Sequence, residues 1–220
     1  FNMFTAISVN GSPADGYSSG QAIKAIEEVA AETLPTGYGY EFSGMTREEQ
    51  SASGNTTALI FALCLVFVYL LLSAQYESYI LPLGVILSVP FGLMGSFIFA
   101  QFMGVENDIY MQIALIMLIG LLAKNAILIT EFALERRQSG MSIVSAAVLG
   151  ASARLRPILM TSLAMVIGLL PMMFASGVGA NGNSTLGTGA IGGMFIGMIC
   201  QIFTVPAMFV AFQYLQEKIK

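Results

Sequence analysis

Long apolar runs separated by short polar stretches occupy the last three quarters of the chain. Five runs of 18–25 residues lie at about 57–74, 80–103, 109–132, 157–176 and 188–212. At 1.5 Å per residue, a helix of that length crosses about 30 Å of hydrocarbon. The pattern therefore predicts a membrane all-α bundle of five transmembrane helices over residues 53–220. Ser142–Gly150, between the third and fourth runs, predicts a short surface helix.

The first fifty residues follow a different pattern. Residues 4–9 and 38–42 alternate in the period-two manner of strands, and apolar positions between 22 and 33 recur at helical spacing. A strand, a crossover helix and a second strand favour a parallel βαβ unit. We therefore expect residues 1–52 to form a small βαβ domain. A unit of this size buries too little core to stand alone, so we expect it to dock on strands from elsewhere.

The composition supports a membrane protein and argues against an enzyme. Hydrophobic residues make up 56% of the chain and charged residues 10%, against about 25% charged in soluble domains. Mean hydropathy is +0.77. The sequence has no His, and Cys64 and Cys200 both lie in apolar runs, where isolated thiols are typical packing residues. We see no nucleophile–base pair and no cluster of metal ligands, and expect no catalytic residue, metal or cofactor.

The basic residues predict the orientation. Arg136, Arg137, Arg154 and Arg156 lie between the third and fourth runs, and Lys218 and Lys220 follow the fifth. Cytoplasmic loops are enriched in Lys and Arg, so we expect this loop and the C-terminus in the cytoplasm and residues 1–52 on the opposite side. Residues 1–55 contain no signal peptide, and the chain starts at Phe1. We therefore expect it to be part of a longer polypeptide.

Lys124 is the clearest candidate for function. A charge near the middle of a membrane helix costs about 2.5–3.5 kcal/mol on insertion scales and usually has a partner in a polar interior. Glu131 is the only carboxylate inside the five runs, roughly 10 Å further along the helix axis. One interpretation places the counter-charge on a helix outside this chain. The other has Lys124 extend to the cytoplasmic surface. The adjacent Asn125 adds a group that can hydrogen-bond across helices.

Two further sets of residues have both a structural and a functional interpretation. Thr161 can bond the carbonyl one turn back, and Arg154 can anchor at the interface. Alternatively, the two form part of a polar path from the cytoplasm to Lys124. The spacing Gly189-x-x-x-Gly193-x-x-x-Gly197 predicts a groove for close helix packing, without a ligand.

Several motifs together resemble one transporter family. They run in order along the chain: Leu34-Pro-Thr-Gly, Phe42-Ser-Gly-Met, Gln75-Tyr-Glu-Ser, Val89-Pro-Phe-Gly, Asn107-Asp-Ile-Tyr, Gly120-Leu-Leu-Ala-Lys-Asn, Leu155-Arg-Pro-Ile-Leu-Met-Thr-Ser and Gly187-Thr-Gly-Ala-Ile-Gly-Gly-Met. They resemble the resistance–nodulation–division superfamily, in its hydrophobe/amphiphile multidrug efflux branch. The resemblance is to the C-terminal part of such an inner-membrane pump: the end of a periplasmic porter subdomain, followed by transmembrane helices eight to twelve.

The resemblance implies a function and partners. Such pumps are homotrimers in the inner membrane of Gram-negative bacteria, driven by the proton gradient, and export hydrophobic or amphiphilic compounds through a periplasmic adaptor and an outer-membrane channel. It implies that Lys124 pairs with two aspartates on a helix missing here, with Asn125, Arg154 and Thr161 in the same proton relay. We therefore expect the chain to be inactive alone. Two alternatives stay open: a truncated membrane subunit that assembles with or regulates a full pump, and a protein-translocation accessory, against which the motifs count.

Overall fold

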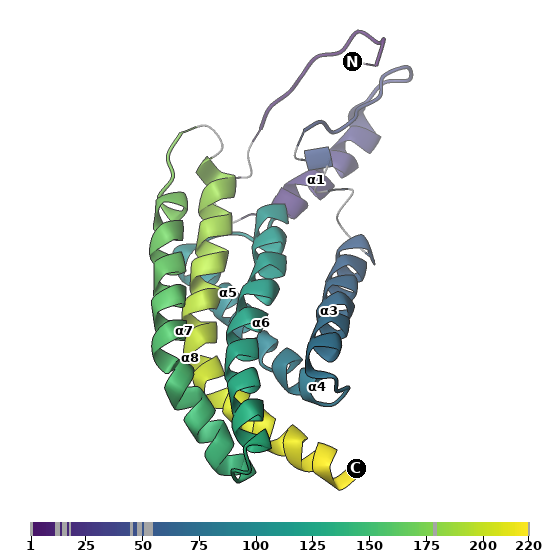
Figure 1. Ribbon diagram of the computed structural model, residues 1–220. Helices are drawn as coiled ribbons and strands as arrows, with labels where there is room; N and C mark the ends of the chain where they lie inside the picture. The colour runs from purple at the N-terminus through teal and green to yellow at the C-terminus, as the bar shows by residue number, and fades with distance from the viewer. Residues whose placement is uncertain are drawn as a thin grey trace. The chain divides into compact units, whose positions relative to one another are not determined.

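The structure is a computed structural model that describes residues 2–11, 14, 17, 19–44, 46–47, 50, 55–177 and 180–219. The chain separates into two compact units, Phe1–Ala52 and Ser53–Lys220. Figure 1 shows both, with helices labelled. Each unit is described below by itself.

The first unit contains helix α1, Ser19–Thr33, where the sequence predicts a helix. The hydroxyl of Thr33 donates to the carbonyl oxygen of Val29 at 2.6 Å, and the helix ends before Pro35. The predicted strands at 4–9 and 38–42 are wrong for this structure, because no strand forms in the described part of residues 1–52. Two short parallel strands without further strands to pair with bury too little surface to be stable.

The second unit is entirely helical in its described residues. Its helices are α3 (Asn55–Tyr76), α4 (Leu81–Ile86), α5 (Val89–Met103), α6 (Ile109–Gln138), α7 (Ile143–Met173) and α8 (Ala180–Ile219). Five stretches in the described residues are long and apolar enough to cross a membrane, with α4 and α5 together forming the second. The predicted bundle of five membrane-spanning helices is therefore confirmed as to helix number and composition.

The fourth membrane helix begins earlier than the hydropathy pattern predicts. The stretch Ser142–Gly150 is not a separate surface helix, because α7 starts at Ile143 and continues through Pro157 to Met173. Ser142 caps this helix, and its hydroxyl accepts a hydrogen bond from the amide of Ser145 at 3.3 Å. Neighbouring helices allow a membrane helix to continue past a proline.

Helix α8 is the centre of the bundle. It contacts α4, α5, α6 and α7, whereas α3 packs mainly against α4 and α6. The core contains fully buried side chains from several of these helices, among them Leu72, Val85, Leu122, Ile129 and Val205. α8 bends in its C-terminal half (Figure 1), where Pro206 cannot donate a backbone hydrogen bond to Ile202. The α6–α7 connection and the C-terminal end of α8 lie at the same end of the bundle.

Candidate functional site

Lys124 lies on an uncovered strip of α6. Apart from Gln138 at its end, the exposed residues of this helix recur at intervals of seven and four, which place them on one face: Ile113, Gly120, Lys124, Glu131 and Glu135. We call these five residues the open stripe. The residues around Lys124 in sequence, Leu122, Ala123, Asn125 and Ala126, are all buried. Lys124 is therefore the only exposed side chain in its turn of α6, and it points away from the bundle.

The counter-charge of Lys124 is absent from the described part of the chain. No described carboxylate oxygen lies within 4.0 Å of its ammonium nitrogen. Glu131 shares the open stripe but is seven residues away, roughly 10 Å along the axis. The open stripe thus presents a cation, a carboxylate two turns away and a glycine between apolar neighbours.

Asn125 faces the interior and joins two helices. Its side-chain amide donates to the hydroxyl of Ser162 on α7 at 3.1 Å. Both side chains are buried, with exposed fractions of 2% and 1%. This bond fixes α6 against α7 one residue after Lys124. Ser162 ends the Leu155-Arg-Pro-Ile-Leu-Met-Thr-Ser motif, but its bond to Asn125 was not predicted, because the partner of a serine in an apolar run is known only once the facing helix is known.

Arg154 and Thr161 lie on the same helix but have different surroundings. The guanidinium of Arg154 lies over the ring of Phe132, 4.8 Å from its centre, and Arg136 lies 5.0 Å from the same ring. The hydroxyl of Thr161 donates to the carbonyl of Ile158 at 3.2 Å, the local bond that a threonine often makes in a helix. Among the described residues, no hydrogen bond joins Lys124 directly to either residue. Thr161 precedes Ser162 in sequence, and Ser162 accepts the hydrogen bond from Asn125.

The glycines of α8 face two other helices at close range. A Cβ at Gly189 would lie 2.6 Å from the sulfur of Met111 on α6. One at Gly197 would lie 2.7 Å from a methyl carbon of Leu122, and one at Gly193 would overlap Leu118 and Ser96. On α5, a Cβ at Gly95 would lie 2.7 Å from Ile196, so both sides of this contact need small residues. The hydroxyl of Ser96 also donates to the carbonyl of Gly189 at 2.6 Å.

Gln201 on α8 is a second buried amide that was not predicted. It is 1% exposed, and its nitrogen lies 3.2 Å from the hydroxyl of Ser88 and 3.1 Å from the carbonyl oxygen of Leu122. The amide therefore joins α8 to α6 and to Ser88, the residue that precedes α5. The sequence signal was present as a glutamine in an otherwise apolar run, but its partners come from distant segments.

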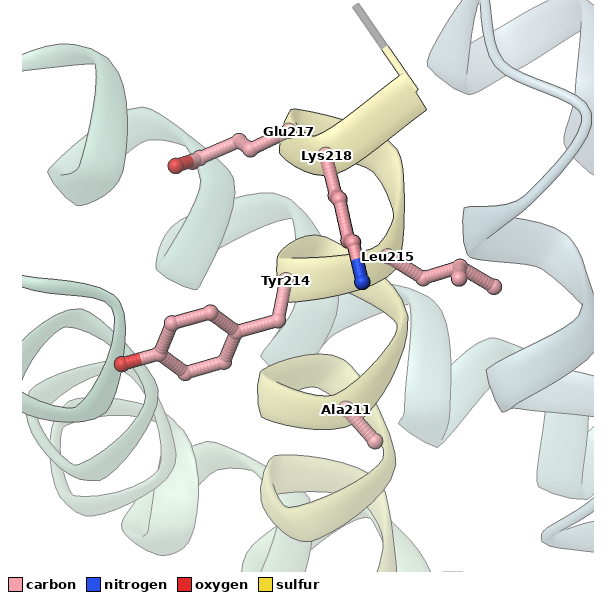
Figure 2. A pocket seen from close by; sticks show the side chains of 5 residues that line it. All are labelled: Ala211, Tyr214, Leu215, Glu217 and Lys218. Carbon is pink, nitrogen blue, oxygen red and sulfur yellow. The ribbon is translucent and has the colours of Figure 1, made fainter.

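The pocket drawn in Figure 2 is unrelated to Lys124. Ala211, Tyr214, Leu215, Glu217 and Lys218 line it, and all five belong to the last turns of α8. Their side chains fan out in different directions from one helix. This is an open surface near the C-terminus, and it encloses no ligand-sized site. Among the described residues, no group of three or more Cys, Asp or Glu side chains could hold a metal ion.

Fold and site together define a multi-pass membrane protein with a charged residue inside a bilayer-length helix, a feature typical of transporters. The chain belongs to the AcrB/AcrD/AcrF family, which it matches over residues 1–213. The predicted membership of the resistance–nodulation–division superfamily is thereby confirmed.

The similar proteins are efflux transporters. The chain is 46% identical over 211 residues to the toluene efflux pump membrane transporter TtgB of Pseudomonas putida, covering 96% of this chain and 20% of that protein. It is 41% identical over 221 residues to the multidrug resistance protein MdtF of Escherichia coli, covering 100% of this chain and 21% of that protein. The chain thus spans about one fifth of the length of these relatives.

Proposed function

We propose that this chain is the C-terminal membrane part of a proton-driven transporter that exports hydrophobic or amphiphilic compounds from a Gram-negative cell. One observation carries the proposal: Lys124 projects from the open stripe of α6 without a carboxylate partner in the described chain. The names of the relatives, a toluene pump and a multidrug resistance protein, support the substrate class.

In this proposal, Lys124 is half of a proton-coupling site. A helix from the rest of the transporter lies along the open stripe and brings two aspartates to Lys124. Protonation of these carboxylates removes their attraction to the ammonium group and lets the covering helix shift against α6. Asn125, held by Ser162, fixes the inner side of the same turn. Arg154 and Thr161 belong to the polar path that leads from the cytoplasm.

The same proposal assigns location and partners. The chain lies in the inner membrane with its C-terminus in the cytoplasm and residues 1–52 in the periplasm as part of a porter subdomain. Arg136 and Arg137 in the last turn of α6 and Lys218 near the end of α8 support this orientation, because the α6–α7 connection and the C-terminal end of α8 lie at one end of the bundle. The transporter is a homotrimer that works with a periplasmic adaptor and an outer-membrane channel. Lipid surrounds the membrane helices, and no cofactor takes part.

The test is the Lys124→Ala variant in the assembled transporter. We expect it to abolish efflux while expression and trimer formation stay normal, because the side chain does not contribute to the core. Thr188→Val on α8 is a control, since this residue is buried and its hydroxyl has no hydrogen-bond partner in the described residues. Efflux at the wild-type rate in the Lys124 variant would refute the proton-coupling role. Such a result, with stable co-purification of this chain and a complete pump, would favour the regulatory subunit.

A further inference from the structure

We propose that Gln201 is the positioning residue for Lys124: its amide joins α5 and α8 to the turn of α6 that carries the lysine. The inference rests on the proposed role of Lys124. Gln201 donates to the carbonyl oxygen of Leu122, two residues before Lys124. Its second donor bond goes to the hydroxyl of Ser88.

The orientation of the amide follows from its two partners. A backbone carbonyl such as that of Leu122 only accepts, so the group facing it must be the amide nitrogen. Ser88 donates its own hydroxyl proton to the carbonyl of Val85 at 2.6 Å, which leaves the oxygen free to accept. Turning the amide over would place its oxygen against two acceptors. The amide nitrogen of Gln201 therefore donates one proton to Ser88 and the other to Leu122, and both partners require this orientation of the amide.

The bond from Gln201 to Leu122 lies at the level of Lys124 along α6. Leu122 and Asn125 flank Lys124 in one turn of α6, and each is held by a side-chain amide. Gln201 holds the first from α8, and Asn125 itself bonds Ser162 on α7. These two attachments fix the rotation of α6 about its axis at the level of Lys124. A rotation by even one residue position, about 100°, would turn the lysine out of the open stripe and into the bundle.

A purely structural role explains Gln201 less well. Its side-chain oxygen is buried and has no hydrogen-bond partner among the described residues. A buried polar atom without a partner lowers stability, so an apolar side chain of equal length would fill this place at less cost. An apolar residue could therefore fill the core, but it could not make the two donor bonds of Gln201.

The test compares Gln201→Met, Ser88→Ala and Thr188→Val in the assembled transporter. Methionine keeps the length and removes both donor bonds, whereas Ser88→Ala leaves the bond to Leu122. Thr188→Val removes from the same helix a buried hydroxyl that has no hydrogen-bond partner among the described residues. The first measurement is the rate at which a small acylating reagent modifies Lys124, followed by mass spectrometry. The second is the efflux rate.

We expect Gln201→Met to change the Lys124 modification rate and to lower efflux by about threefold each, the size of one average interhelical hydrogen bond in a membrane. Ser88→Ala should have a smaller effect on both rates, and Thr188→Val should change neither. A Lys124 modification rate in Gln201→Met equal to that in Thr188→Val overturns the positioning role. The proton-coupling role of Lys124 is tested by a different variant, and normal efflux in Lys124→Ala would refute that role alone.

Discussion

Asn125 and Lys124 are neighbours in sequence but, about 100° apart around the axis of α6, one is buried and the other exposed. Asn125 is buried against Ser162 of α7, and Lys124 is exposed on the open stripe. The charged residue was recognisable from the sequence because a cation in hydrocarbon is costly wherever its partner lies. Neutral polar residues such as Ser162 and Gln201 cost much less, and their partners come from helices far away in sequence. Only the folded chain brings them together.

The bond between Asn125 and Ser162 is testable by a double-mutant cycle. We expect Asn125→Ala to lower the free energy of unfolding by about 0.6–2 kcal/mol, because it removes a buried interhelical hydrogen bond. Ser162→Ala should have a similar effect, and the double variant should lose less than the sum. Thermal unfolding of the purified transporter measures all three. Strictly additive losses would show that the two side chains do not interact.

At the scale of the helices, hydropathy predicts the membrane-spanning parts and misses their extensions. The predicted starts at 57 and 109 agree with the first residue of the apolar stretch in α3 and with the first residue of α6. The predicted end of the third run at 132 is too early, because α6 continues to Gln138 through charged residues. Helical hydrogen bonding does not stop where the hydrocarbon stops. The strands failed for a different reason, since strand formation needs a partner edge that sequence alternation does not supply.

The close contact of α5 and α8 leads to a prediction at this scale. We expect Gly193→Ala to destabilise the bundle by about 1–3 kcal/mol, because the added methyl group overlaps Leu118 and Ser96. Gly168→Ala on α7 is the matched control, since its Cβ would meet nothing within 4 Å. Alanine also favours helix over glycine, so the control should be neutral or stabilising by up to about 1 kcal/mol. Equal unfolding temperatures for both variants would contradict the packing.

At the scale of the whole membrane unit, one ion pair joins the ends of two long helices. Arg137 of α6 and Glu217 of α8 form two parallel hydrogen bonds of 2.8 Å each, and the same guanidinium donates to the carbonyl of Met141 at 2.6 Å. Gln213 adds a bond of 3.0 Å to the carboxylate. One arginine thus holds the α6–α7 connection and the end of α8 together, at the end of the bundle that carries most of the basic residues.

Loss of this pair should loosen the end of the bundle and leave its core intact. We expect Arg137→Gln to raise hydrogen exchange in residues 139–142 and 213–218, because both segments lose the shared guanidinium. Arg136→Gln is the control, since Arg136 lies over Phe132 and takes no part in the pair. Partly exposed ion pairs are screened by salt, so the difference between the variants should shrink at high ionic strength. Unchanged exchange in both segments would show that the pair does not order them.

The tight contacts of Gly95, Gly193 and Gly197 also have a genetic consequence. A single-base change in a glycine codon that alters the amino acid always introduces a residue with a Cβ atom. At these three positions that atom meets α6, α8 or α5 at once, whichever residue is introduced. Random mutagenesis should therefore yield destabilised alleles at these codons, and larger side chains should destabilise more than alanine. The codon for Gly168 specifies a residue with no such neighbour within the described chain and should tolerate small replacements.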